Sequence, residues 1–383
     1  MAIQLASSPC GHLVPTINGQ QAYVPDPLPR DVELSSSVIY RLDEASRAVG
    51  TLAGAGETVP NPHLLIRPFI RREAVLSSRI EGTQASISDL LLYEASGQRG
   101  ARGDVAEVAN YVRALEDGIR LLDELPISLR LVNQMHSVLM RGVRGADRRP
   151  GELRTSQIWI GSAGTPIEEA RYIPPPANLL RDLLADWELF VNDRAKVPPL
   201  VKCALMHYQF EAIHPYPDGN GRIGRLLVVL FLCASKILET PLLYLSAYFE
   251  RDREEYYSQL LQVSLTGNWE PWLVYFLDGV AEQARDSLVR TRRVRALVDR
   301  HRRLLQDRRE SGNALRLLDE LSASPFMNAP YAARLLGVTN AGARGILGRL
   351  VAAGILEESP GSWPRLYVAR ELLDAIEAPI ATD

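Results

Sequence analysis

The sequence predicts a mainly α-helical protein with a small β-hairpin midway along the chain and a smaller C-terminal unit of helices and short strands. Apolar residues recur at helical spacing in most segments, as Val38, Leu42 and Ala45 do near the N-terminus. Short alternating stretches around glycine and proline turns occur within residues 151–176 and again within 355–368. Helices therefore dominate the expected fold, and strands are expected only at these two places.

Length and composition limit the classes of protein to consider. The chain has 383 residues and a formal net charge of −3 at pH 7. This length predicts two or three domains, and the charge argues against general coating of nucleic acid. Cys10, Cys203 and Cys233 have no metal-ligand spacing and indicate buried thiols in a reducing cytosol. No signal peptide and no apolar run long enough for a bilayer is recognisable, so we expect a cytoplasmic protein without a membrane segment.

The N-terminal third predicts a leader and two helices. Residues 1–34 are rich in proline, glycine and serine and predict an extended leader on the surface. A helix is expected from Ser35 to a stop at Gly50. A second helix is expected over residues 64–80, with Pro68 either kinking it or marking its start.

The middle of the chain predicts more helices around one hairpin. After a flexible loop at residues 96–104, helices are expected at 105–122, 128–140, 179–191 and 199–212. Strands are expected at 157–160 and 170–173, which would form a hairpin. His136 and His207 lie within helical patterns, and we interpret both as packing residues.

The most informative stretch, HPYPDGNGRIGR, spans residues 214–225. Gly219, Asn220 and Gly221 can adopt positive backbone φ, so their N–H groups can converge on one anion. The apolar run over residues 223–234 predicts a buried helix whose positive N-terminal end lies at the same place. The stretch therefore predicts a phosphate-binding loop, although it lacks the GxxxxGKS/T pattern of a P-loop.

Charged side chains within this stretch indicate the chemistry. Arg222 and Arg225 lie on one side of the predicted helix, and guanidinium groups suit phosphate oxygens. Asp218 offers a carboxylate oxygen, the ligand that Mg²⁺ prefers beside phosphates. His214 can be neutral near pH 7 and accept a proton. A structural turn would need neither a histidine base nor paired arginines.

The stretch resembles the Fic family motif HPFx(D/E)GNGRxxR and departs from it only in Tyr216, where phenylalanine is usual. The resemblance implies a mainly helical Fic core that transfers a nucleoside monophosphate, most often AMP from ATP, to a hydroxyl of a target protein. It implies that His214 deprotonates this hydroxyl and that Asp218 holds Mg²⁺. The glycine-flanked loop would bind the α and β phosphates, and the two arginines would bind the outer phosphates.

A second pattern of the same family ends the helix expected over residues 64–80. The sequence SSRIEG, which runs from Ser77 to Gly82, fits the inhibitory pattern (S/T)xxxE(G/N). Ser77 and Glu81 are four residues apart and so lie on one helical face. The resemblance implies that Glu81 pairs with Arg225, occupies the place of the γ-phosphate and keeps basal activity low. A solvated glutamate at a helix end is the alternative.

Further roles follow from the same resemblance. The hairpin expected within residues 157–173 resembles the family's flap, which holds a segment of the target protein by strand addition. A hairpin without this role is the alternative. Tyr256 and Tyr257 are candidates for a wall against the adenine ring, although aromatic residues at such spacing usually belong to the core.

The C-terminal part predicts a linking helix and a separate unit. Residues 285–312 are rich in arginine and predict a long helix with a solvated basic face. Contact of this face with nucleic acid is the alternative. Beyond it, the order of helices and two short strands resembles a winged helix-turn-helix. The expected helices are at 313–323, 328–336 and 339–353, and the expected strands are at 355–358 and 365–368. Arg344 and Arg349 form a sparse basic surface on the third helix, which leaves DNA contact, protein interaction and dimerisation open.

Four domains are expected: a leader with the inhibitory helix at 1–103, a Fic core at 104–284, the linking helix at 285–312 and the winged-helix unit at 313–383. We hypothesise a protein adenylyltransferase that uses ATP and Mg²⁺ and is autoinhibited by Glu81. The alternatives are a hydrolase that removes AMP at the same site and a DNA-binding regulator whose Fic core senses nucleotide. The target protein, the donor nucleotide and the oligomeric state, a homo-oligomer included, stay open.

Overall fold

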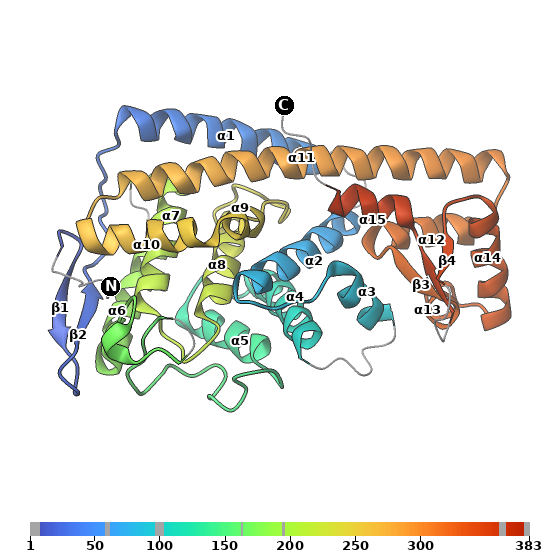
Figure 1. Cartoon of the computed structure of the whole chain (residues 1–383). Helices are drawn as coiled ribbons and strands as arrows, with labels where there is room; N and C mark the ends of the chain where they lie inside the picture. The colour runs from blue at the N-terminus through green and yellow to red at the C-terminus, as the bar shows by residue number, and fades with distance from the viewer. Residues whose placement is uncertain are drawn as a thin grey trace.

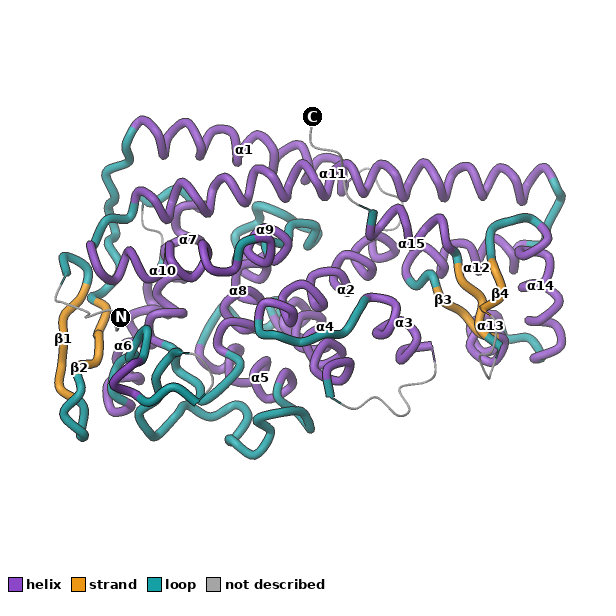
Figure 2. Tube along the Cα trace, viewed as in Figure 1, coloured by secondary structure: helices purple, strands orange, loops and turns teal. Residues whose placement is uncertain are grey.

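The computed structural model confirms the expected fold class, with helices throughout and two small antiparallel sheets (Figures 1 and 2). It describes residues 8–57, 62–95, 103–161, 164–193, 196–359 and 365–378. The expected loop at 96–104 and the turn between the last two strands lie largely outside these residues. Among the helices described, none is both long enough and apolar enough to cross a bilayer.

The N-terminal residues form a β-hairpin, so the expectation of an extended surface leader is wrong. Strand β1 (Gly11–Pro15) pairs antiparallel with β2 (Gln21–Pro25) at one end of the molecule (Figure 1). Ala22 and Tyr23 are fully buried, and the Tyr23 N–H donates to Ile173 O at 2.9 Å. The apolar side chains of β2 pack against helices of the core, and this burial stabilises the hairpin on the core surface.

Two long helices run side by side along one edge of the molecule (Figure 1). Helix α1 (Ser36–Glu57) continues through Gly50, where a stop was expected, because packing along α11 stabilises it over its length. Helix α11 (Glu270–Asp307) contains most of the arginine-rich linker and begins at Glu270. The boundary expected at residue 285 therefore lies inside a continuous helix.

The helices between these two agree closely with the sequence patterns. Helix α2 (Pro62–Ile80) contains Pro68 in its interior and ends just before Glu81. Helix α3 (Ile87–Ala95) was not expected. The other helices of this part lie within a few residues of the predicted bounds: α4 (Asp104–Leu121), α5 (Leu129–Leu139), α6 (Leu180–Asn192) and α7 (Pro199–Ile213).

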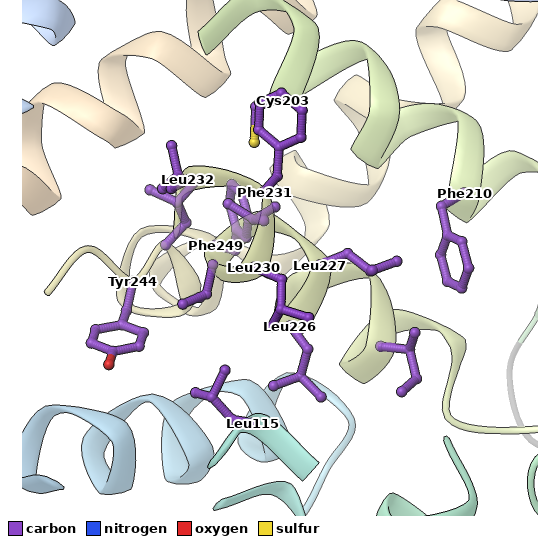
Figure 3. Close-up of a cluster of buried hydrophobic side chains, with 14 of the residues drawn as sticks. Leu115, Cys203, Phe210, Leu226, Leu227, Leu230, Phe231, Leu232, Tyr244 and Phe249 are labelled. Carbon is purple, nitrogen blue, oxygen red and sulfur yellow. The ribbon is translucent and has the colours of Figure 1, made fainter. Parts of the chain in front are cut away.

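Helix α8 (Asn220–Ala234) lies within the larger core and is packed by α4, α5 and α7. It is buried around most of its circumference, as is typical of a helix enclosed by others. It begins at Asn220 rather than at Ile223, so its first N–H groups belong to the motif loop. Figure 3 shows side chains of this core, among them Leu115, Cys203, Phe210, Leu226, Leu227, Leu230, Phe231, Leu232, Tyr244 and Phe249.

The flap segment is less regular than expected. Within its described residues, one isolated antiparallel bridge joins Ile160 to Tyr172, and the strands expected at 157–160 and 170–173 do not form. A short 3₁₀ helix, η1 (Ile167–Glu169), lies between them. Prolines before this helix and directly after Ile173 remove backbone donors, which limits the ladder.

The C-terminal unit packs at the other end of the molecule, against α2 and α11 (Figure 1). Its sheet has the strand order β3-β5-β4. The order of elements agrees with the expected one, and β3 and α15 are additional; the identification as a winged helix-turn-helix stays a prediction. The elements are α12 (Gly312–Ala323), β3 (Phe326–Asn328), α13 (Ala329–Leu336), α14 (Asn340–Ala352), β4 (Glu357–Ser359), β5 (Leu366–Val368) and α15 (Arg370–Glu377). On α14, Arg344 is exposed, whereas Arg349 pairs with Glu310 at 2.9 Å.

Candidate functional site

A cavity of about 760 Å³ lies beside the motif loop. The end of α7, the start of α8, the flap segment and α10 (Arg253–Thr266) supply its walls; α10 follows the short helix α9 (Ser246–Arg251). The cavity brings together most of the predicted site: Glu81, His214, Asp218, Gly219, Asn220, Gly221 and Arg222. The other two predicted residues, Ser77 and Arg225, are buried next to the cavity.

The motif loop has the backbone that an anion cradle requires. Gly219 has a φ of 79° and caps α8, whose first N–H groups are left without helical partners. The Asn220 side chain is not available to a ligand, because it accepts from Tyr216 N–H and donates to Tyr216 O, both at 2.8 Å. Asn220 therefore holds the loop closed, and only its backbone N–H can contact an anion.

His214 has the protonation state of a base. It ends α7 with a left-handed φ of 49°, a conformation that is uncommon for a non-glycine residue. Its Nδ1 lies 3.2 Å from Glu211 O, and because a carbonyl can only accept, Nδ1 carries the proton. Burial lowers the pKa of His214 to about 4. At pH 7 the ring is neutral, with Nε2 as an acceptor.

Arg154 anchors the motif loop, a role that nothing in the sequence predicted. Its side chain is buried and donates to His214 O at 2.9 Å and to Pro175 O at 2.5 Å. The main-chain N–H of Arg154 also donates to Pro215 O at 3.0 Å. A single arginine thus ties the motif loop to the base of the flap. The sequence contains no pattern that marks it.

His136 also supports the loop, so its interpretation as a structural residue is confirmed. Its Nδ1 accepts from Gly151 N–H at 2.8 Å, which leaves Nε2 to donate to Asp218 O at 3.0 Å. Its ring stacks on Tyr216 with centroids 3.9 Å apart. The Tyr216 hydroxyl donates to Asn133 Oδ1 at 2.6 Å, so tyrosine replaces the usual phenylalanine without leaving its hydroxyl unpaired.

Arg225 is held by the two residues that the inhibitory pattern predicted. Its Nε donates to Ser77 Oγ at 2.8 Å, and its Nη2 donates to Ser77 O at 2.9 Å and to Glu81 Oε1 at 2.8 Å. Burial opposes ionisation of Glu81, but the charge and hydrogen bond of Arg225 together with the charge of Arg222 outweigh it and lower the pKa of the carboxyl. The pair is therefore ionised at neutral pH. Gly82, with a φ of 91°, ends the turn that carries Glu81.

Arg222 lies deeper than expected for a phosphate clamp. It is 1% exposed, and its Nη1 lies 3.4 Å from Glu107 Oε2 while its Nη2 lies 3.5 Å from Asp218 Oδ1. Glu107, on α4, is buried and was not recognised in the sequence. Arg222 thus adds positive charge to the floor of the cavity while Glu107 partly neutralises it.

Asp218 is the residue that suits a metal ion. Its side chain is 35% exposed, and its Oδ1 accepts from Gly219 N–H at 2.6 Å. In the part of the chain that the structure describes, no cluster of three or more His, Cys, Asp or Glu residues could hold a metal. A single carboxylate beside an anion cradle fits Mg²⁺, which takes its other ligands from phosphates and water.

The two tyrosines proposed for the adenine ring have different surroundings. Tyr257 lines the cavity. Tyr256 is 1% exposed and donates to His207 Nε2 at 2.9 Å, while His207 Nδ1 donates to Gly224 O at 3.1 Å. Tyr256 and His207 are therefore core residues, as expected for His207, and Tyr257 alone of the two tyrosines lies where it could contact a ligand.

Comparison with known proteins gives similarity over two adjacent regions. Residues 39–120 match the family described as Fic/DOC family N-terminal, and residues 126–232 match the Fic/DOC family. The chain is 30% identical over 127 residues to protein adenylyltransferase fic-1 of Caenorhabditis briggsae, covering 33% of this chain and 22% of that protein.

Two further matches extend this similarity. A probable protein adenylyltransferase of Aquifex aeolicus is 27% identical over 196 residues, covering 50% of this chain and 53% of that protein. The chain thus spans about half, or less, of the length of these curated relatives. The crystal structure of a Fic family protein from Desulfovibrio desulfuricans G20 shares the fold, with a TM-score of 0.56 and 19% identity over 88% of this chain and 97% of that one.

Proposed function

The chain matches the two Fic/DOC family regions at residues 39–120 and 126–232, and from this premise we propose that it is a protein adenylyltransferase. It transfers AMP from ATP to a hydroxyl side chain of a target protein. The observation that carries the proposal is a neutral His214 at the mouth of an anion cradle, inside a cavity large enough for a nucleotide. The names of the relatives favour transfer over a hydrolase or a DNA-binding regulator.

The residues of the site divide the chemistry between them. His214 Nε2 takes the proton of the target hydroxyl, and the hydroxyl oxygen then attacks the α-phosphorus. A new O–P bond forms as the bond from the α-phosphorus to the bridging oxygen breaks, which releases pyrophosphate. The N–H groups at the start of α8 and the charge of Arg222 stabilise the phosphate oxygens. Asp218 would hold Mg²⁺, which neutralises phosphate charge.

Autoinhibition by Glu81 is part of the same proposal. Glu81 and Ser77 occupy the Nε and Nη2 donors of Arg225, so the guanidinium is held in place and cannot turn these two groups to an outer phosphate. ATP that binds in this state lacks one of its clamps, and its α-phosphorus is less well aligned with the attacking oxygen. Release of Glu81 frees Arg225 and raises the rate.

The target protein would dock at the flap. The bridge between Ile160 and Tyr172 places residues 160 and 161 at the cavity wall, where an added strand would bring its hydroxyl toward His214. We also place the protein in the cytoplasm, where free thiols persist, since Cys10, Cys203 and Cys233 are unpaired. The proposed reaction requires neither DNA nor a second copy of the chain.

The test uses ATP labelled at its α-phosphate, with Mg²⁺, and measures label on the protein itself. The chains compared are wild type, Glu81→Gly, Glu81→Gly/His214→Ala and, as a matched control, Glu124→Gly, which changes an exposed glutamate in the turn after α4. We expect Glu81→Gly to incorporate label at least tenfold faster than wild type and Glu124→Gly, and the double variant to incorporate none. Equal labelling of the single and double variants would exclude His214 as the base, and absence of label in Glu81→Gly would contradict the proposed transfer.

A further inference from the structure

A carboxyl that none of these steps uses lies at the end of α7. Glu211 lines the cavity, and its main-chain oxygen accepts from His214 Nδ1. Its side-chain Oε1 is buried and has no hydrogen-bond partner among the described residues. A buried polar atom without a partner is costly in a folded protein, so this oxygen calls for an explanation.

The first two turns of α8 provide space for this carboxyl. A Cβ added at Gly224 would lie 2.1 Å from Glu211 Oε1, and one added at Gly221 would lie 2.5 Å from Glu81 Oε1. Positions 221 and 224 are three apart and so lie on one face of the helix. Two carboxyls therefore rest on one glycine face at the N-terminal end of α8, and Arg225 belongs to the next turn. This is the region that the phosphates of a nucleotide would occupy.

The groups that surround Glu211 set its protonation. Burial raises the pKa of Glu211 to about 8, the charge of Arg225 opposes this rise, and the charge of Glu81 adds to it. The other titratable groups nearby are His214, His207 of the same helix as Glu211, and Tyr256 and Tyr257 of α10. All are neutral at pH 7, because burial lowers the pKa of His214 to about 4 and that of His207 to about 3 and raises those of both tyrosines. Glu211 is thus a neutral acid at pH 7 while Glu81 is in place, and a phosphate, being negative as well, would raise the pKa of Glu211 in the same direction.

We propose that Glu211 is a phosphate-binding residue, which donates its carboxylic O–H to an oxygen of the nucleotide's phosphate chain. The inference rests on the proposed function, because it requires that a nucleotide occupies the cavity. The acid form gives the phosphate one more donor beside Arg225, whereas a carboxylate at the same place would repel it. Affinity for the nucleotide therefore depends on one proton held by the protein.

The experiment measures the Kd of ATP with Mg²⁺ by isothermal titration calorimetry between pH 6 and pH 9. The parent is Glu81→Gly, in which Arg225 loses its carboxylate partner and keeps its hydrogen bonds to Ser77; Glu211→Gln and Glu211→Ala are added to it. Glutamine keeps a donor at every pH, so this variant should bind ATP within about threefold of the parent at pH 6 and show a flatter profile. The parent should lose affinity toward pH 9, by at least tenfold relative to the glutamine variant, and the alanine variant should bind about tenfold more weakly at pH 6.

The control is Glu124→Gln in the same parent. Glu124 is exposed in the turn after α4 and does not line the cavity, so its substitution should leave the pH profile unchanged. Identical profiles of the parent and the Glu211→Gln variant would overturn the inference, and so would unchanged affinity in the Glu211→Ala variant. If the parent binds no ATP at any pH, the proposed function fails and this inference fails with it; binding without dependence on Glu211 contradicts the inference alone.

Discussion

At the scale of single residues, side chains outside the motif determine the geometry of its loop. Arg154 donates to the main-chain oxygens of His214, Ile213 and Pro175. These three oxygens lie on two segments that are far apart in the sequence. The planar guanidinium can reach them together because its donors are arranged in a rigid fork. The position of the base thus depends on a residue that takes no part in the proposed proton transfer.

Arg154→Lys tests this dependence. Lysine keeps the charge but has no fork, so at least one buried carbonyl loses its donor, and we expect the free energy of unfolding to fall by about 2 kcal/mol. In the Glu81→Gly background, transfer of labelled AMP should slow at least tenfold because His214 is no longer held. Urea denaturation and initial labelling rates measure the two effects. Arg120→Lys, at a side chain 68% exposed, is the control, and equal behaviour of the two lysine variants would exclude a positioning role.

At the scale of elements, the glycines differ sharply in what surrounds them. Gly50 and Gly54 lie in α1, are exposed and have no atom within 4 Å of an added Cβ. Gly118 lies in α4, where an added Cβ would be 2.9 Å from Met135 Sδ and 3.2 Å from Leu230 Cδ2. The first two glycines only weaken a helix, whereas the third permits the close packing of α4 against its neighbours.

Alanine should therefore stabilise the protein at positions 50 and 54 and destabilise it at position 118. We expect Gly50→Ala and Gly54→Ala each to raise the free energy of unfolding by about 0.5–1 kcal/mol, because alanine favours the helix and restricts the unfolded chain. Gly118→Ala should lower it by about 1–3 kcal/mol through overpacking. Chemical denaturation measures these changes in the free energy of unfolding, and the m-value should stay the same in all variants. A destabilised Gly50→Ala would show that α1 does not continue through this position in solution.

At the scale of the whole molecule, four histidines with lowered pKa values make folding sensitive to acid. Burial lowers the pKa values of His136 and His214 to about 4 and that of His207 to about 3, and it also lowers the pKa of His301. In the unfolded chain a histidine titrates near pH 6.5. Between these values the unfolded state binds more protons than the folded state, so stability falls as the pH falls from about 6.5 toward 4. Glu211 acts in the opposite direction, because its raised pKa lets the folded state hold a proton from about pH 8 downward.

Replacing one of these histidines should make this pH dependence shallower. His207 is fully buried in the core, so His207→Phe removes one titrating group. The variant should be less stable at pH 7, because Gly224 O and the Tyr256 hydroxyl lose a partner. Its loss of stability between pH 6.5 and 4.5 should nevertheless be smaller than in wild type, by up to about 3 kcal/mol. Urea unfolding over this range measures it, and a slope equal to that of wild type in His207→Phe would contradict the prediction.

The sequence by itself determined most of the helices and the composition of the site. Helical periodicity is a local property, so α4, α5, α6 and α7 could be predicted to within a few residues. The motif residues His214, Asp218 and Gly219 are close in sequence, and their spacing alone indicates a base beside an anion cradle. Local patterns failed where packing outweighs propensity, as in the glycine-containing α1, the buried hairpin strand β2 and the irregular flap.

Only the tertiary structure decided which distant residues complete the site. Glu81 and Ser77 reach Arg225 across more than 140 residues, and this contact was expected from family resemblance rather than from any local pattern. Arg154, Glu107 and the carboxyl of Glu211 have no sequence pattern at all. Their roles arise because buried charges and main-chain groups must find partners wherever the packed helices bring them together, and a one-dimensional pattern contains no information about that proximity.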